Sequence, residues 1–388
     1  MASSPSPVAI AGSATQIVCG EHVSAVVTED GELHTFGRGD TWQLGRRAGG
    51  RRRRQEQEET EEETEETEEE EEELDDPEHC FHPQRVTEPA SLRGCVASVA
   101  LGADHGVAVD TGGRLFAFGR GSFSQLGLGD ARDRARPTLV EGLRGKAVVS
   151  AACGWRFTLA ACANGEVFSW GAGSAGQLGH PSRLRRRVPT KIEALADAVA
   201  VSAGETHAMA MDAAGAVYVW GSNQHGRLGL GEVDEWGAER TTPTVVASVP
   251  ARISAGNRHS ACVTRSGVLY TWGCNADGRL GLGTTRDACT PQRIALPGKP
   301  TVATVACGVA HTLALSAAGR IFAWGSGKSG RLGVGGSGSG SGGAGSEHEN
   351  RLSPAPVVVA SDPQMRFVDV AAGSNHNLAV QDTGKVMA

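Results

Sequence analysis

Five histidines are the residues of this 388-residue chain whose type and regular spacing first suggest chemistry. His105, His207, His259, His311 and His376 each stand three residues after a glycine, in the phrase G-x-x-H. An imidazole can act as a general base or as a metal ligand. These five, however, recur at one position of a repeated phrase, which is typical of a structural residue. We therefore predict that they are hydrogen-bonded framework positions.

Other groupings that could support catalysis or hold a cofactor are weak. His79, Cys80 and His82 carry metal-binding side chains, but no second cluster with matching spacing stands elsewhere. The phosphate-binding phrase GxxxxGK[ST] is absent, and no nucleophile is paired with a base in a recognisable pattern. The sequence accordingly predicts no catalytic residue, no cofactor and no metal, which leaves non-covalent activities such as nucleotide exchange open.

The cysteines and the apolar runs indicate the compartment. Nine cysteines form no CxxC pair, and Cys19, Cys153 and Cys307 directly precede repeat glycines where other repeats have Ala or Ser. We interpret them as small apolar residues in a reducing compartment. No apolar run approaches the roughly 18 residues that span a membrane, and MASSPSPVAI lacks the features of a signal peptide. We expect an intracellular protein, cytoplasmic or nuclear or both, with no membrane partner.

The charge of the chain is concentrated in one segment. The formal net charge is −7, but residues 56–73 contain 14 glutamates, and six arginines stand just before them. Without this segment the chain is nearly neutral. No strong positive field is indicated, so we expect no direct binding to nucleic acid.

The G-x-x-H phrase belongs to a repeat of about 51 residues. A second phrase, [WF]-G followed by [QR]-L-G, stands six times, as in WGCNADGRLGLG at 272–283. The glycines of the first phrase occur seven times, mostly 50–52 residues apart, and are Gly20, Gly102, Gly154, Gly204, Gly256, Gly308 and Gly373. A fixed period of this length is typical of propellers and other repeat architectures.

Each repeat is predicted to be a small β-sheet. A glycine follows eight residues after the histidine position in all seven units and suits a hairpin turn, as in Asn164-Gly165. The next strand has aromatic residues two apart, such as Phe168 and Trp170, with apolar residues such as Val167 on its other face. Both faces must then be buried, which requires sheets stacked around an axis. We predict an all-β fold, a seven-bladed β-propeller; kelch repeats have a similar period, but their glycine doublet is missing.

The boundaries of this propeller follow from the repeat. We predict one domain over residues 8–388, with insertions after two [QR]-L-G phrases. Residues 46–80 are Arg-rich and then Glu-rich and are expected to be disordered, and residues 335–353 form a Gly/Ser-rich insertion in blade 6. The seventh unit stops at KVMA, where the next aligned residue would be the aromatic. Either the chain is truncated, or blade 7 closes against an N-terminal strand near Ala14–Cys19.

These two phrases resemble the repeat of the regulator of chromosome condensation family, and the resemblance covers nearly the whole chain. It implies a seven-bladed propeller. Val23 and Phe157 replace the repeat histidine, and Trp42 and Ser124 replace a loop glycine of the second phrase.

Both phrases are predicted to form loops on one face of the disc, because the glycine hairpins lie at the other end of the strands. On a repeat scaffold such a face, with variable residues on a constant frame, is the usual place for binding. Trp155 beside Arg156 is typical of an interface anchor. The predicted partner-binding residues are Asp104, Trp155, Arg156, Glu205, Asn257, Arg258 and Asn375.

The resemblance implies three functions. The founding member of the family is the exchange factor of the small GTPase Ran, so the first hypothesis is a monomeric protein-interaction platform that regulates a Ran-like GTPase by nucleotide exchange. The second is a substrate-recognition or targeting scaffold, like the propellers attached to ubiquitin ligases. A remote third is a UV-B photoreceptor, because Gly154-Trp155-Arg156-Phe157-Thr158 is similar to a motif of that sensor.

Overall fold

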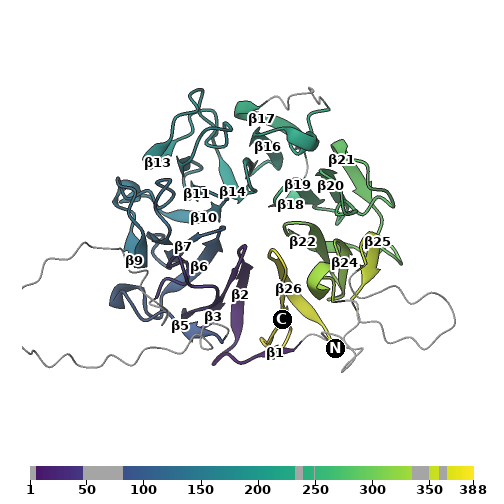
Figure 1. Ribbon diagram of the computed structural model, residues 1–388, viewed down its shortest axis with the longest axis horizontal. Coiled ribbons are helices and arrows are strands. Elements are labelled where there is room, and N and C mark those ends of the chain that lie inside the picture. Colours follow the sequence, from purple (N-terminus) through teal and green to yellow (C-terminus); the bar gives the residue numbers. More distant parts are fainter. Residues whose placement is uncertain (1–5, 47–81, 232–238, 249, 334–348, 358–364) are drawn as a thin grey trace, which may run out of the picture.

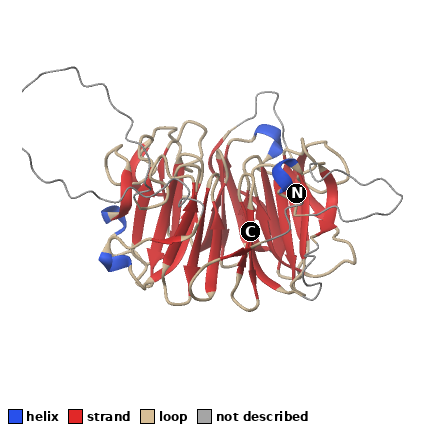
Figure 2. Cartoon of the chain, turned by 60° about the horizontal axis from the view of Figure 1, so that its bottom comes forward, coloured by secondary structure: helices blue, strands red, loops and turns tan. Residues whose placement is uncertain are grey.

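Seven four-stranded antiparallel sheets form a closed ring in the computed structural model (Figure 1). The structure describes residues 6–46, 82–231, 239–248, 250–333, 349–357 and 365–388. Each sheet is one blade, and its first strand lies nearest the centre of the ring. Figure 2 shows the strands running through the thickness of the disc, with loops at both faces. The predicted fold class, an all-β seven-bladed propeller, is confirmed.

The blades follow the chain in order. Blade 1 contains β2 (Ala14–Cys19), β3 (Val23–Thr28), β4 (Leu33–Gly37) and β5 (Gln84–Arg85); blade 2 contains β6 (Val96–Leu101), β7 (His105–Asp110), β8 (Leu115–Gly119) and β9 (Arg134–Leu139). Blade 3 contains β10 (Val148–Cys153), β11 (Phe157–Cys162), β12 (Val167–Gly171) and β13 (Arg186–Lys191); blade 4 contains β14 (Ala198–Ala203), β15 (His207–Asp212), β16 (Ala216–Gly221) and β17 (Arg240–Ser248).

Blade 5 contains β18 (Pro250–Ala255), β19 (His259–Thr264), β20 (Leu269–Gly273) and β21 (Ala288–Ile294); blade 6 contains β22 (Val302–Cys307), β23 (His311–Ser316), β24 (Ile321–Gly325) and β25 (Arg351–Pro356). Blade 7 contains β26 (Phe367–Ala372), β27 (Asn377–Gln381), β28 (Val386–Met387) and the N-terminal β1 (Pro7–Val8). The described residues also include four short 3-10 helices: η2 (Ala90–Leu92), η3 (Glu141–Leu143), η4 (Gln224–Gly226) and η5 (Lys328–Gly330).

Hairpin turns join the two middle strands of each blade where the sequence predicts them. Gly165 has φ +80° and its N–H bonds the carbonyl of Cys162, which closes the turn between β11 and β12. A side chain at Gly165 would meet the backbone of Asp197, which enters the next blade. The glycine is therefore required both by the turn and by the close approach of the following blade.

The core lies between neighbouring blades, as the double-sided apolar pattern predicts. Trp170 of blade 3 is fully buried and packs in a cluster with Leu115 and Leu126 of blade 2. The equivalent Trp220, Trp272 and Trp324 are also fully buried. Burying a side chain of this size is worth several kcal/mol, so the aromatic spacers are a main source of cohesion between blades.

The ring closes through β1, which corrects one of the two alternatives raised by the sequence. Pro7 and Val8 pair with Met387 and Val386, and Ser6 and Ala388 exchange backbone hydrogen bonds of 3.0 Å. The range Ala14–Cys19, expected to close blade 7, is instead the innermost strand of blade 1. Only two residues of the N-terminal segment pair with β28, and so short a strand has no recognisable alternation in the sequence.

The two predicted insertions fall largely outside the described residues. Residues 47–80 of the first insertion and residues 335–348 of the second lie there. Strand β25 begins at Arg351, inside the range 335–353, so the predicted C-terminal boundary of the second insertion lies too far along the chain.

Candidate partner-binding face

The two repeated phrases meet on one face of the disc, as predicted. In blade 3 the backbone N–H of Ala172, just after Trp170-Gly171, donates to the carbonyl of Arg156 at 2.9 Å. Blades 1, 2, 4, 5 and 6 contain the same bond; its donors are Arg38, Arg120, Ser222, Cys274 and Ser326. In blades 1 to 6 the G-x-x-H loop is therefore fixed at its second variable residue by the neighbouring loop of its own blade.

The glycines of the G-x-x-H phrase form a closely packed ring at the centre of this face. A side chain on Gly256 would lie 2.6 Å from the carbonyl oxygen of Gly308, and one on Gly308 would lie 2.6 Å from that of Gly373. The ring closes because Gly373 stands in the same relation to the carbonyl of Gly20. Close contact between neighbouring backbones makes this mouth a rigid frame.

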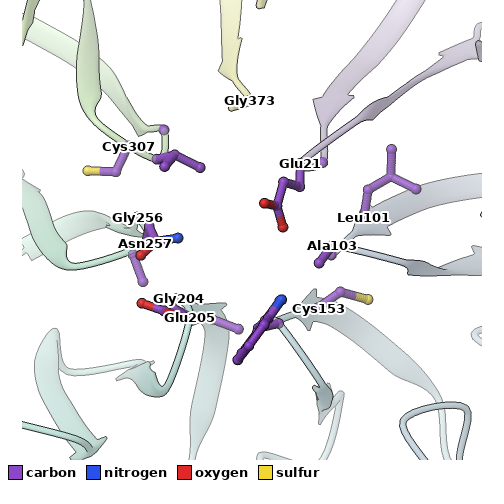
Figure 3. Close-up of a pocket in the computed structure, with 18 of the residues that line it drawn as sticks. Glu21, Leu101, Ala103, Cys153, Gly204, Glu205, Gly256, Asn257, Cys307 and Gly373 are labelled. Carbon is purple, nitrogen blue, oxygen red and sulfur yellow. The ribbon is translucent and has the colours of Figure 1, made fainter. Parts of the chain in front are cut away.

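The first variable residue of the phrase faces the mouth of the central channel. Glu21, Trp155, Glu205 and Asn257 line a cavity there together with the ring glycines and the residues before them. Figure 3 shows Glu21, Glu205 and Asn257 around this opening. The mouth therefore combines carboxylates, an amide and one indole, a set that suits recognition of a partner better than covalent chemistry.

The second variable residue lies outside the mouth and interacts with neighbouring loops. The guanidinium carbon of Arg156 is 4.0 Å from the ring centroid of Trp155 and 4.0 Å from that of Phe123. Arg156 is thus close to an aromatic ring of its own blade and to another of blade 2. Trp155 keeps 39% of its surface exposed, so this aromatic–cation group is accessible to a partner.

Ion pairs hold the other predicted residues in place. Asp104 pairs with Arg120 at 3.3 Å within blade 2, and Arg258 of blade 5 pairs with Glu205 of blade 4 at 3.2 Å. Arg227 lies beneath Glu205 with its side chain 1% exposed and donates to Thr206. Burial lowers the pKa of Arg227 to about 10. It is still charged at neutral pH and gives this part of the face a buried positive charge next to Glu205.

The predicted residues divide into three groups in space. Trp155, Glu205 and Asn257 line the mouth, whereas Asp104, Arg156 and Arg258 surround it. Asn375 lies apart, in an apolar cavity between blades 6 and 7.

Sequence reasoning missed four residues of this face: Glu21, Phe123, Arg120 and Arg227. Glu21 stands in the same column of the repeat as Trp155 and Glu205, so aligning that column would have found it.

The repeat histidines form hydrogen bonds across the joints between blades, which confirms their framework role. His259 Nε2 lies 2.8 Å from Thr312 Oγ1 of the next blade, and that hydroxyl donates to the carbonyl of Arg279. The indole N–H of Trp324 donates to the same carbonyl. The other pairs are His105 with Thr158, His207 with Ser260, His311 with Asn377 and His376 with Ser24.

Two joints replace this hydrogen bond with apolar residues on both sides. Blade 3 has Phe157 in place of the histidine, and the hydroxyl position of blade 4 is Ala208. Blade 1 has Val23, and the corresponding position of blade 2 is Gly106. A lone hydroxyl or imidazole at a buried joint would lose its partner, so both residues change together.

Burial keeps the repeat histidines neutral. It lowers the pKa of His105 to about 3 and that of His311 to about 4, and it lowers the pKa values of His207 and His259 well below the ordinary range. A charged imidazole in these sites would lose its hydration without gaining a counter-ion. These residues cannot act as bases toward a substrate.

One group of described residues has side chains suited to a metal ion. His225, Cys274 and Asp287 place their ligand atoms within 4.8 Å of one another at the joint of blades 4 and 5. His225 Nδ1 is 2.8 Å from Asp287 Oδ2, and Asp287 Oδ1 accepts the N–H of Asn275. These bonds account for the cluster as a polar contact between blades. Of His79, Cys80 and His82, which the sequence did not favour as a metal site, the first two lie outside the described residues.

The eight described cysteines are all free thiols. Burial raises the pKa values of Cys19 and Cys307 to about 12 and also raises that of Cys153. These thiols behave as small apolar residues, as the sequence predicts, because a thiolate would be unfavourable there. In the described part of the chain, no helix is long and apolar enough to cross a membrane.

The fold and this face define a repeat propeller with a loop surface suited to binding. The pattern of the RCC1-like domain matches residues 2–250, and that of the regulator of chromosome condensation (RCC1) repeat matches residues 266–315 and 318–380. The chain therefore belongs to the regulator of chromosome condensation family.

Curated relatives include several different proteins. The chain is 34% identical over 295 residues to the ultraviolet-B receptor UVR8 of Arabidopsis thaliana, covering 75% of this chain and 64% of the receptor. It is 37% identical over 243 residues to the human E3 ubiquitin-protein ligase HERC2, covering 61% of this chain and 5% of the ligase. It is 32% identical over 353 residues to the mouse secretion-regulating guanine nucleotide exchange factor, covering 79% of this chain and 69% of that factor.

Solved structures support the same fold. Yeast RCC1 (Prp20), solved bound to Kap60, superposes with a TM-score of 0.76 at 21% identity, covering 96% of this chain and 79% of Prp20. Human WBSCR16 gives a TM-score of 0.76 at 21% identity, covering 97% of this chain and 89% of that one.

Proposed function

We propose that the loop face binds a protein partner, and that this partner is a Ran-like small GTPase whose nucleotide exchange the propeller promotes. The observation that carries the proposal is Arg156 placed 4.0 Å from the rings of both Trp155 and Phe123 at the edge of the channel mouth. An accessible Trp–Arg pair on a rigid frame is the kind of group that dominates binding energy at protein interfaces. Asp104, Glu205, Asn257 and Arg258 add polar contacts around it.

Exchange fits this face because it needs no covalent chemistry. A rigid surface that binds the nucleotide-free GTPase more tightly than the loaded form lowers the affinity of the GTPase for its nucleotide by linkage. Similarity to the mouse secretion-regulating guanine nucleotide exchange factor supports this activity. A structure of yeast Prp20 reported with its binding to Gsp1p and histones, 20% identical with a TM-score of 0.75, supports the fold on which it would occur.

The test is the release of fluorescent GDP from Ran and from a panel of related GTPases, with this protein at catalytic amounts. We expect faster release for one GTPase, and at least tenfold less acceleration by the Trp155→Ala/Arg156→Ala variant. Val245→Ala is the matched control, because Val245 is 53% exposed on the outermost strand of blade 4 and away from the face. If Val245→Ala reduced the acceleration of GDP release as much as the double variant, the cause would be general destabilisation of the propeller.

A substrate-recognition scaffold is the second candidate, supported by similarity over 243 residues to a part of HERC2. It uses the same face without exchange. If no GTPase of the panel releases nucleotide faster while the propeller melts cooperatively, exchange on Ran and these relatives is excluded. Affinity capture would then use two baits, the unmodified protein and the Trp155→Ala/Arg156→Ala variant. A protein that binds the first bait and not the second is a partner that depends on these residues.

A further inference from the structure

The joint between blades 4 and 5 brings a histidine, a cysteine and an aspartate together on the loop face. His225 belongs to η4 of blade 4, Cys274 follows β20 of blade 5, and Asp287 directly precedes β21. A ring nitrogen of His225, the Sγ of Cys274 and a carboxylate oxygen of Asp287 all lie within 4.8 Å of one another. None of the three belongs to the Trp155–Arg156 group, so a ligand bound here is independent of the proposed exchange function.

The carboxylate of Asp287 is held in place by its own loop. Its Oδ1 accepts the backbone N–H of Asn275 at 2.7 Å, and in blade 2 the Oδ1 of Asp133 accepts the N–H of Gly121 at the same distance. The repeat therefore uses only one oxygen of this carboxylate for its internal structure. The other oxygen, Oδ2, is directed across the joint and lies 2.8 Å from His225 Nδ1 when no metal is bound.

The thiol of Cys274 is fixed and buried, yet it has no hydrogen-bond partner. Its backbone N–H donates to the carbonyl of Arg258 at 2.9 Å, and its side chain is 4% exposed. In the described part of the chain its Sγ forms no hydrogen bond, whereas the buried thiol of Cys153 donates to the carbonyl of Ala100 at 3.5 Å. Burial is the main influence on the pKa of Arg227, but a negative charge on Cys274 raises that pKa. The guanidinium is thus close enough to favour a thiolate.

The other joints show that this combination is particular to blades 4 and 5. The equivalent contact at the joint of blades 5 and 6 runs from Asn350 Nδ2 to Asp277 Oδ1 at 3.3 Å, so the positions correspond. Each of the other four joints from blade 1 to blade 6 has at most one carboxylate at the three positions, and neither a histidine nor a cysteine. Their residues are Thr41, Arg120 and Asp133; Phe123, Ala172 and Arg185; Ala175, Ser222 and Glu239; and Asp277, Ser326 and Asn350.

A thiolate, an imidazole and a carboxylate are ligands that zinc binds in proteins, at about 2.0–2.3 Å. Around a tetrahedral zinc ion such ligand atoms stand about 3.3–3.8 Å apart. The side chains of His225 and Asp287 are 41% and 36% exposed, so they can turn by the small amount that this geometry requires. The thiolate and the carboxylate together balance the charge of Zn²⁺, and the soft sulfur disfavours Mg²⁺ and Ca²⁺.

We propose that His225, Cys274 and Asp287 bind one Zn²⁺ ion, with a water molecule as the fourth ligand. Cys274 releases its proton to solvent, His225 coordinates through Nδ1 with its proton on Nε2, and Asp287 coordinates through Oδ2 in place of its bond to His225. Because the ligands come from two blades, the ion joins their loops next to Arg258, one of the predicted partner-binding residues. The ligands stand in separate repeats and match no metal-binding motif, which is why the sequence predicted no metal.

Cobalt(II) is the probe, because a thiolate bound to cobalt gives a charge-transfer band in the near ultraviolet. The full chain is freed of metal with a chelator and titrated under reducing conditions. We expect a saturable band at one cobalt ion per chain, and loss of the band when Zn²⁺ displaces the cobalt. Zn²⁺ should also raise the melting midpoint of the metal-free protein, because it binds the folded state.

Three single variants test the ligands. Cys274→Ala should abolish the band and weaken Zn²⁺ binding at least tenfold, and Ala172 of blade 3 shows that the repeat accommodates alanine at this position. His225→Asn and Asp287→Asn should each weaken Zn²⁺ binding at least tenfold. Asparagine tolerates the φ of +60° at His225, and at Asp287 it keeps the Oδ1 acceptor.

The matched control is His79→Ala/Cys80→Ala, which removes another neighbouring histidine and cysteine of the sequence. This variant should keep both the band and the affinity for Zn²⁺. The proposal is overturned if the unmodified protein shows no saturable band, if the band survives Cys274→Ala, or if the control loses it. If Cys274→Ala does not melt cooperatively, the two asparagine variants decide, and an unchanged Zn²⁺ affinity in both of them overturns the proposal.

Discussion

The imidazole of His259 and the hydroxyl of Thr312 lie 2.8 Å apart across the joint of blades 5 and 6, with both side chains fully buried. His259→Phe alone leaves this hydroxyl without its imidazole partner and should lower the free energy of unfolding by about 1–3 kcal/mol. Adding Thr312→Ala reproduces the Phe157–Ala208 joint and should recover part of that loss. Chemical denaturation of the two single variants and the double variant measures the coupling energy between His259 and Thr312. If the two single losses of unfolding free energy simply added in the double variant, the predicted coupling would be contradicted.

Acid should destabilise the ring through the same histidines. The unfolded chain takes up protons near pH 6.5, whereas the folded pKa values of His105 and His311 are about 3 and about 4. Their contribution to stability is complete above pH 6.5 and is lost as the pH falls toward those folded values, by about 1.4 kcal/mol per pH unit for each histidine. Denaturation at pH 7, 6 and 5 measures the slope. The His259→Phe/Thr312→Ala variant should have a shallower slope, and an unchanged slope would contradict this account.

Ser124→Gly should stabilise the protein. Ser124 replaces a loop glycine, has φ +61°, is fully buried and has an Oγ that is unpaired in the described structure. Glycine removes both the left-handed strain and the unpaired hydroxyl, a gain of about 1 kcal/mol. Thermal melting should show a higher midpoint. Ser122→Gly is the control, because Ser122 is exposed and is not among the residues with positive φ.

The Trp155→Ala/Arg156→Ala variant should remain folded. The cation–π contacts of Arg156 lie at an accessible surface and are worth about 1–2 kcal/mol together. Phe157→Ala, at the next position, removes a fully buried ring and should cost about 3–5 kcal/mol. Thermal melting compares the two. If the double variant lost more thermal stability than Phe157→Ala, the face residues would belong to the core.

Much of the fold could be predicted because each blade repeats local signals. The hairpin glycine, the paired aromatics and Leu178 of the QLG phrase act within one blade or on its neighbour, so seven copies reinforce one another. The hydrogen bonds between neighbouring blades were harder to predict, because the two bonded residues lie 53 positions apart in the sequence. Examples are His105 with Thr158 and His259 with Thr312. That constant offset was present in the sequence. The closing strand Pro7–Val8 was not predictable, since two paired residues carry no period.

The candidate partner-binding face could be predicted as a set of neighbouring loops, but the arrangement of its side chains could not. The repeat places Trp155 and Arg156 on one loop, yet only packing brings Phe123 of the previous blade against the guanidinium. Asn375 shows the opposite case. It shares a repeat column with Arg156 and Arg258, but it lines the cavity between blades 6 and 7 and not the channel mouth.

The apolar joints at Val23 and Phe157 make the ring uneven around its circumference. Five joints contain an imidazole that is hydrogen-bonded across the joint and can take up a proton, and these two contain none. The two joints divide the ring into an arc of blades 2 and 3 and an arc that runs from blade 4 through blade 7 to blade 1. A disc that is nearly sevenfold in shape is therefore polarised in its response to acid: one polar joint lies within the shorter arc and four lie within the longer one.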